Sequence, residues 1–126
     1  MLGERKANSG FAVKDMDAAR EFYEGTLGLR VEVFDEQHGV TMLHLAGGYD
    51  VLMYLSAEMT PPSYTILNFE VDDIDAAVEG LTERGVSFER YEDFDHDEKG
   101  IVHGPGPQIA WFKDPSGNTL SVLQQP

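Results

Sequence analysis

The side chains that could carry out chemistry in this 126-residue chain are few, because it has no cysteine and only four histidines. The absence of cysteine excludes thiol nucleophiles, disulfides and Cys-ligated zinc or iron–sulfur centres. His44 lies within an alternating apolar segment, where an imidazole could contact a ligand or act as an acid or base. Glu70 could act as a general base if its carboxylate were desolvated. These two side chains are therefore the candidate catalytic residues.

Each of these candidates also has a simpler structural role. His44 could be a histidine that is hydrogen-bonded at a cavity wall or at an interface. Glu70 could lie at a solvated strand end. No Gly-x-Ser-x-Gly elbow is present, so the sequence gives no support for a serine hydrolase.

Aromatic and amide side chains point to binding rather than catalysis. Tyr54 and Trp111, the single tryptophan, could form aromatic walls that stack on planar or cationic ligands. Their alternative role is packing in the core or at a dimer interface. Strand alternation places Ile66, Asn68 and Glu70 on the face that points away from the neighbouring helix.

The charge balance narrows the classes of partner. Nine basic and 23 acidic residues give a net charge of −14, which argues against nucleic acids and anionic membranes. An acidic surface could attract cationic ligands, or it could simply keep the protein soluble. No apolar run is long enough to span a bilayer and no signal segment is visible, so we expect a cytoplasmic protein.

An internal repeat sets the architecture. The segment 11–21 matches the segment 69–79 at seven of eleven positions, with a constant offset of 58 residues. We therefore expect one domain over residues 1–126, with a first module over about 8–59, a linker over about 60–63 and a second module over about 64–124.

Each module begins with a strand and a helix. The first strands are expected at Ser9–Val13 and Tyr64–Val71, and Asp15 and Asp73 stand where helix N-caps belong. Gly28 and Gly85 should end the two helices. Three further strands follow each helix, at Arg30–Phe34, Val40–Ala46 and Tyr49–Ser56 in the first module and at Val86–Tyr91, Gln108–Lys113 and Asn118–Gln124 in the second.

The predicted fold class is α+β, with two βαβββ modules in tandem. Two curved four-stranded sheets would pair around a cavity, with one helix outside each sheet. This repeat, with Leu27-Gly28-Leu29 and the turn from Asp114 to Asn118, resembles the vicinal oxygen chelate (VOC) superfamily. That superfamily includes glyoxalase I, extradiol dioxygenases, fosfomycin-modifying enzymes and bleomycin resistance proteins. The resemblance covers the chain from about Asn8 to Gln124.

The resemblance also implies where a metal would bind. Metal-dependent members present four ligands, usually His, Glu or Gln, from four strands that face the cavity. The corresponding residues here are Asn8, Leu52, Ile66 and Ser121, with Met53 in place of Leu52 if the register shifts by one residue. Two of the four are aliphatic, and neither Asn nor Ser binds a first-row ion well alone. We therefore expect no metal and no cofactor.

The leading hypothesis is a metal-free protein of the glyoxalase/bleomycin resistance type that binds a small molecule. A planar cation is the class of ligand that the acidic charge and the aromatic residues suggest. Its expected ligand-binding residues are Asn8, His44, Tyr54, Asn68, Trp111 and Ser121. One alternative is a metal-independent lyase or isomerase that uses His44 or Glu70, and another is a domain with a filled cavity that serves assembly or regulation. Exposed sheet edges favour pairing between two copies of the chain, and members of the superfamily are commonly dimers. We therefore expect a homodimer.

The first prediction concerns the metal. We expect protein prepared without chelator to contain no stoichiometric nickel, zinc, iron or manganese, because Ile66 and Ser121 supply no strong ligand. Elemental analysis measures this content, and thermal unfolding with and without a chelator provides the control. About one ion per chain, or a lower Tm after chelation, would contradict the prediction.

Overall fold

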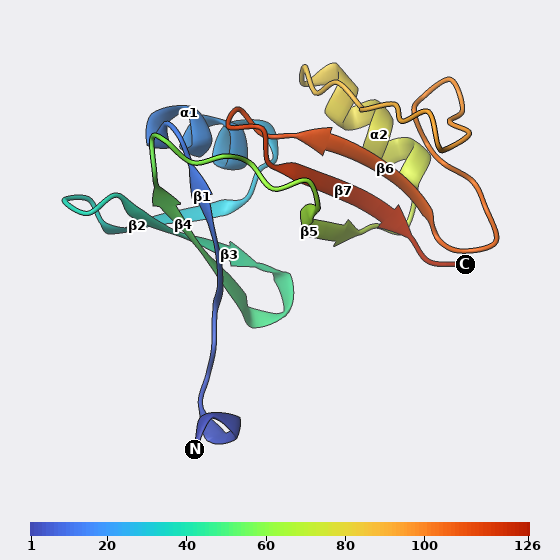
Figure 1. Ribbon diagram of the computed structural model, residues 1–126. Helices are drawn as coiled ribbons and strands as arrows, with labels where there is room; N and C mark the ends of the chain where they lie inside the picture. The colour runs from blue at the N-terminus through green and yellow to red at the C-terminus, as the bar shows by residue number, and fades with distance from the viewer. The chain divides into compact units, whose positions relative to one another are not determined.

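The structure is a computed structural model that describes the whole chain from Met1 to Pro126. The chain forms two compact units, Met1–Met59 and Thr60–Pro126, and each is described here by itself (Figure 1). No helix in either unit is long and apolar enough to cross a membrane.

The first unit contains a four-stranded sheet and one helical segment. Its strands lie in the order β1-β4-β3-β2, with β1 parallel to β4 and the remaining pairs antiparallel. The elements are η1 (Leu2–Glu4), β1 (Ser9–Val13), α1 (Met16–Arg20), η2 (Glu21–Thr26), β2 (Arg30–Asp35), β3 (Val40–Leu45), η3 (Ala46–Gly48) and β4 (Tyr49–Leu55).

The expected first helix consists of two parts. Asp15 caps α1 as predicted, since its carboxylate accepts a hydrogen bond from the amide of Ala18 at 3.1 Å. The chain then widens into the π-helical segment η2, in which the Leu27 amide donates to the Phe22 carbonyl. Tyr23 of this segment is fully buried, and its ring lies 5.6 Å from that of Phe11 on β1. The wide turn thus carries the largest buried side chain of the unit.

The second unit repeats the plan with three strands and one helix. Its elements are β5 (Thr65–Glu70), α2 (Ile74–Glu83), β6 (Gln108–Lys113) and β7 (Thr119–Gln124), and its sheet order is β5-β7-β6. Helix α2 packs on β6 and β7, burying Ile74 and Val78. The helix-facing side chains of the two strands are buried as well; they are Ala110, Phe112, Leu120 and Val122.

Helix α2 begins and ends as its sequence predicts. Asp73 accepts a hydrogen bond from the amide of Ala76 at 3.1 Å. At the other end Gly85 has φ +93°, and the amides of Gly85 and Val86 donate to the carbonyls of Thr82 and Leu81. This pattern is a Schellman motif, which a left-handed residue permits at the helix end.

The predicted fold class is confirmed, with one local difference in the second sheet. The segment 86–91, expected to be a fourth strand, pairs with β6 only through a bridge from Phe88 to Phe112 and through a 2.8 Å hydrogen bond from the Glu89 amide to the Trp111 carbonyl. The ring centroids of Phe88 and Phe112 lie 5.6 Å apart, and this contact holds the segment against β6. The chain beyond Glu89 is irregular, and there the Arg90 guanidinium donates a hydrogen bond to the Glu98 carbonyl at 2.9 Å.

A turn that starts at Asp114 joins β6 to β7. Asp114 is only 5% exposed, and its carboxylate accepts hydrogen bonds from the amides of Ser116 and Asn118 and from the side-chain nitrogen of Asn118, each at 2.9 Å. A carboxylate that satisfies three donors at once fixes the turn and therefore the register of the two strands. The register of β6 against β7 positions Trp111 beside Ser121.

The second prediction concerns this turn. Asp114→Ala should lower the free energy of unfolding by about 2–4 kcal/mol, because it leaves buried donors without an acceptor. The matched control is Asp93→Ala in an exposed turn, which should change stability by less than about 0.5 kcal/mol. Urea unfolding followed by circular dichroism measures both values, and equal effects of the two substitutions would contradict the role of Asp114.

Candidate functional site

The candidate site in the second unit lies on the sheet face that α2 does not cover. Asn68 of β5, Ser121 of β7 and Trp111 of β6 are direct partners across the three strands. Partners in register point to the same side of a sheet, so the three side chains form one row. Three of the six predicted ligand-binding residues are thus brought together.

A short hydrogen bond joins two members of this row. The hydroxyl of Ser121, which is 0% exposed, donates to Oδ1 of Asn68 at 2.6 Å. Asn68 itself is exposed. The buried hydroxyl therefore has its hydrogen-bond partner in the exposed amide.

Trp111, at the other end of the row, belongs to a cluster of aromatic rings. The ring of Phe94 lies 5.3 Å away at a shallow angle of 35°, whereas the ring of Tyr91 lies 5.5 Å away at 74°. The imidazole of His96 is 6.4 Å from the indole. Phe94 is 48% exposed, so the cluster presents an apolar aromatic surface to its surroundings.

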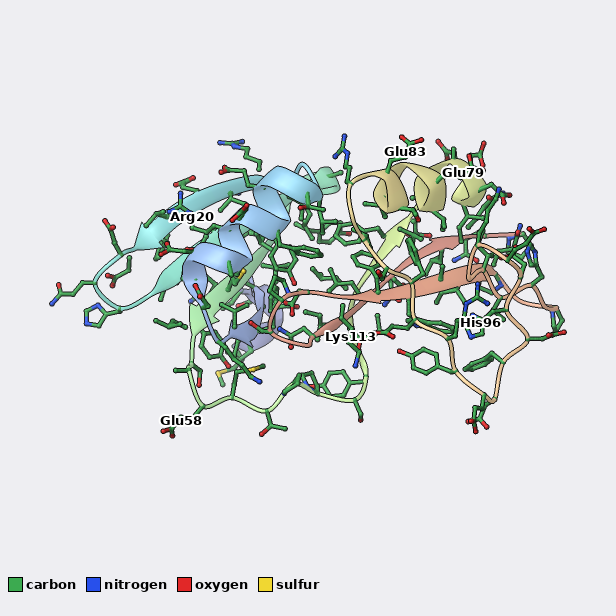
Figure 2. All side chains as sticks on the ribbon, turned by 90° about the horizontal axis from the view of Figure 1, so that it is seen from above. Arg20, Glu58, Glu79, Glu83, His96 and Lys113 are labelled. Carbon is green, nitrogen blue, oxygen red and sulfur yellow. The ribbon has the colours of Figure 1, made fainter.

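His96 holds the segment that carries this cluster. Its Nε2 accepts a hydrogen bond from the Tyr91 amide at 2.9 Å, so its Nδ1 carries the proton and donates to the Gly100 carbonyl at 2.8 Å. In Figure 2, His96 lies on one side of the second sheet, and α2, which carries the labelled Glu79 and Glu83, lies on the other side. The imidazole is thus a structural link in the loop and is partly buried.

Asp97 also stabilises this loop through hydrogen bonds. Partial burial raises the pKa of this carboxyl, but hydrogen bonds from His103 and from the amides of Ile101 and Lys99 outweigh that effect and lower the pKa overall. Burial, together with the nearby charge of Glu89, raises the pKa of the Tyr91 phenol above 10.0. The loop therefore presents anionic carboxylates and a neutral phenol at neutral pH.

In the first unit, His44 lies on the face opposite the helical segment, because its neighbour Leu43 is fully buried on the other face. Its Nδ1 is 2.8 Å from a carboxylate oxygen of Asp50, and its Nε2 is 3.0 Å from one of Glu32. Hydrogen bonds to Asp50 and then Glu32 raise the pKa of the imidazole above its usual 6.5. The two carboxylates bind opposite nitrogens, so the three groups do not converge on one point.

The other predicted residues of the first unit are more dispersed. Tyr54 of β4 is 46% exposed and lies on the same face as Leu52. Asn8 is exposed and precedes β1. Neither lies in the row of Arg30, His44 and Asp50 across β2, β3 and β4.

Glu70 lies at the end of β5 and is exposed. It borders a small groove of about 240 Å³ whose wall includes Asp72 and Gln124. The side-chain oxygen of Gln124 accepts a hydrogen bond from the Ile74 amide at the start of α2. Nothing in this groove desolvates the Glu70 carboxylate as a general base would require.

A larger groove, of about 560 Å³, lies between α2 and the segment 86–99. Lys99 borders it, and its ammonium group contacts Glu79 at 2.7 Å and Asp75 at 3.0 Å. These two carboxylates raise the pKa of Lys99 well above its usual value, Glu79 having the larger effect. The groove is on the helix side of the unit, apart from the row of Asn68, Ser121 and Trp111.

Comparison with known proteins identifies the family. Residues 8–122 match the model of the Glyoxalase/Bleomycin resistance protein/Dioxygenase superfamily. The chain is 25% identical to TnmS3, an antibiotic binding protein from Streptomyces sp. CB03234, with a TM-score of 0.71 and 98% of each chain covered. No curated protein sequence matches.

Two further solved structures share this fold. A superfamily member from Sphaerobacter thermophilus DSM 20745 is 27% identical, with a TM-score of 0.70, and the match covers 96% of this chain and 98% of that one. A glyoxalase family protein from Enterococcus faecalis is 22% identical, with a TM-score of 0.67 and coverage of 98% and 99%.

The residues at the expected metal-ligand positions do not fit a divalent ion. The register places Leu52 on the face opposite the helix, whereas Met53 is fully buried on the other face, so Leu52 is the counterpart of Ser121. Leu52 and Ile66 offer no donor atom, and the Ser121 hydroxyl is engaged with Asn68. No group of three or more His, Asp or Glu side chains in the chain is arranged to hold a metal.

The third prediction concerns the titration of His44. NMR should give this imidazole a pKa above 6.5, and Asp50→Asn should lower it more than Glu32→Gln, because the hydrogen bond to Asp50 has the larger effect. Since the folded-state pKa is raised, the stabilisation is fully present below pH 6.5 and is lost as the pH rises through the folded-state pKa.

Unfolding at several pH values tests the same network. The pH dependence should flatten in His44→Gln, which cannot become charged. A wild-type pKa of 6.5 or below, or an unchanged pKa in Asp50→Asn, would contradict the prediction.

Proposed function

The chain belongs to the Glyoxalase/Bleomycin resistance protein/Dioxygenase superfamily, and we propose that within it this protein is a metal-free binder of small planar aromatic cations. The observation that carries the proposal is the partly exposed aromatic cluster of Trp111, Tyr91 and Phe94, on the sheet face that α2 does not cover. Aromatic faces hold flat ligands by stacking and attract cations through the ring quadrupole.

The distribution of charge supports a cationic ligand. The segment that carries Tyr91 and Phe94 also carries the exposed carboxylates of Glu92, Asp93 and Asp95. The whole chain has a net charge of −14. A cation would therefore be drawn to this surface, and an anion of the same size would be repelled.

The chemistry at the site supports binding over catalysis. Both ring nitrogens of His44 are engaged, with Asp50 at 2.8 Å and Glu32 at 3.0 Å, so neither is directed at a substrate as a general base would be. The similar protein TnmS3 is an antibiotic binding protein. A fold of this kind hosts many functions, so the argument for binding rests on the site itself.

The fourth prediction tests this proposal. The cation 9-aminoacridine should bind about three- to thirtyfold more tightly than anthracene-9-carboxylate, a tricycle of similar size with the opposite charge. Isothermal titration calorimetry gives both Kd values, and quenching of Trp111 fluorescence reports where the cation binds. The difference should shrink in high salt, because the charges are exposed.

Two variants complete this test. Trp111→Phe should weaken binding of the cation, whereas Phe34→Leu, a substitution of an exposed ring on β2, should leave it unchanged. Equal binding of the two tricycles, or an unchanged Kd in Trp111→Phe, would show that the acidic surface serves solubility and that Trp111 only packs.

A further inference from the structure

One side chain joins the two ends of the irregular segment 91–100. The amide of Tyr91 donates to Nε2 of His96 at 2.9 Å, and Nδ1 of His96 donates to the carbonyl of Gly100 at 2.8 Å. Gly100 is buried with φ +97°, and a Cβ atom at this residue would lie only 3.1 Å from Cβ of Phe88. The end of the segment therefore lies against Phe88, and the imidazole connects it to the beginning.

This segment carries most of the aromatic cluster. Tyr91 and Phe94 belong to it, whereas Trp111 belongs to β6. The imidazole of His96 lies among all three rings, with its centroid 6.2 Å from that of Tyr91 and 6.4 Å from those of Phe94 and Trp111. Without the contacts of His96, Trp111 would remain on its strand, but Tyr91 and Phe94 would lose the link that keeps them beside it.

Only one protonation state of His96 makes both hydrogen bonds. Nε2 accepts from an amide and so carries no proton, whereas Nδ1 donates and so carries one. A second proton on the ring would set an N–H at Nε2 against the N–H of Tyr91, and this hydrogen bond would be lost. Because histidine is the side chain that commonly changes its charge between pH 5 and 8, mild acid acts directly on this link.

The groups around His96 do little to offset that loss. Both hydrogen bonds of the imidazole go to backbone atoms. Strand β6 presents the uncharged indole of Trp111, and burial raises the pKa of the Tyr91 phenol, so this group is neutral as well. Helix α2 lies on the other side of the sheet (Figure 2).

The charged side chains of the segment are exposed or engaged elsewhere. Arg90 donates to the Glu98 carbonyl, and Lys99 contacts two carboxylates of α2. The exposed carboxylates form no ion pair with the imidazole, and salt screens their attraction for a protonated ring; they are Glu92, Asp93, Asp95 and Glu98.

The neighbouring histidine responds to acid in the opposite direction. Nε2 of His103 is 2.7 Å from Oδ2 of Asp97. Partial burial raises the pKa of Asp97, but hydrogen bonds from His103 and two amides lower it overall, so the carboxylate stays ionised in mild acid. Protonation of His103 would complete an ion pair and strengthen this contact. The effects of acid through the two histidines are therefore opposite in sign.

We propose that His96 is a positioning residue of the aromatic cluster, and that the cluster binds its cation only while the His96 imidazole is neutral. Mild acid then opens the segment 91–100 and releases the ligand. This inference rests on the proposed function and adds the regulation of the same site by pH.

The probe for this inference is 10-methylacridinium, a planar tricyclic cation whose charge does not change with pH. Calorimetry on the full chain at pH 7.5 and 5.5 should give a Kd about three- to tenfold higher at pH 5.5, because the apparent Kd rises as the fraction of binding-competent protein falls. Most carboxylates remain ionised at pH 5.5, so the acidic surface attracts the cation at both pH values.

Substitutions of His96 separate its charge from its contacts. The amide of His96→Gln offers both an acceptor and a donor but does not titrate, so this variant should have the same Kd at both pH values and bind more tightly than His96→Ala. A merely structural role would leave the pH dependence in place. His103→Gln is the matched control in the same region and should keep the rise in Kd at pH 5.5.

A measurement without ligand covers the case in which a variant does not fold. Hydrogen exchange followed by NMR should give the Tyr91 amide of the wild-type protein a lower protection factor at pH 5.5 than at pH 7.5. An unchanged protection factor would show that acid leaves this hydrogen bond intact and would overturn the inference.

The binding outcomes separate the inference from the proposed function. If 10-methylacridinium binds the wild-type protein with the same Kd at both pH values, regulation by His96 is wrong and the proposed function stands. If His96→Gln keeps the rise in Kd, another group causes it and the inference is overturned. If the probe does not bind even at pH 7.5, the proposed function is overturned, and the inference with it. A rise in Kd that disappears only in His96→Gln supports both.

Discussion

Burial of one sheet face beneath a helix is the constraint on which the rest of this structure depends. Successive side chains of a strand point to opposite faces, so placing Leu120 and Val122 under α2 forces Ser121 to the other side. The same rule turns His44 away from the helical segment once Leu43 is buried. Each unit therefore divides into an apolar face that stabilises it and a second face whose residues are free to serve another purpose.

The sequence predicts the elements that local rules determine. Asp15 and Asp73 cap helices, Gly85 ends one, and strand β1 covers the expected residues. Prediction fails where the backbone conformation depends on tertiary packing or lies in an irregular, charged segment. The π-helical widening of η2 depends on how Tyr23 packs, and the segment 86–91 leaves the sheet where charged residues begin.

The candidate site could be predicted only in part, for similar reasons. Alternation places His44, Asn68 and Ser121 on the correct faces, but it does not identify the partners of His44. Asp50 and Glu32 come from neighbouring strands, and which of them meets His44 depends on the register of two hairpins. The rings of Tyr91, Phe94 and His96 lie in an irregular segment without strand periodicity. Aromatic residues interleaved with acids were the only signal of this cluster.

The repeat shows how two similar scaffolds come to present different surfaces. The positions shared by segments 11–21 and 69–79 include the helix caps Asp15 and Asp73 and the Phe and Val residues of the first strands, which maintain the fold. The residues that differ include Gly10 and Asn68, together with Leu52 and Ser121, and all four lie on the faces that the helices leave uncovered.

The residue at position 121 determines what kind of chemistry the second face can perform. A carboxylate at this fully buried position would need a metal or a strong donor to offset its desolvation. A serine hydroxyl needs only one acceptor, and Asn68 supplies it at 2.6 Å. At the position where the resemblance to the superfamily implies a metal ligand, this chain therefore has a buried neutral hydroxyl paired with an amide, which supplies no charge to hold a divalent ion.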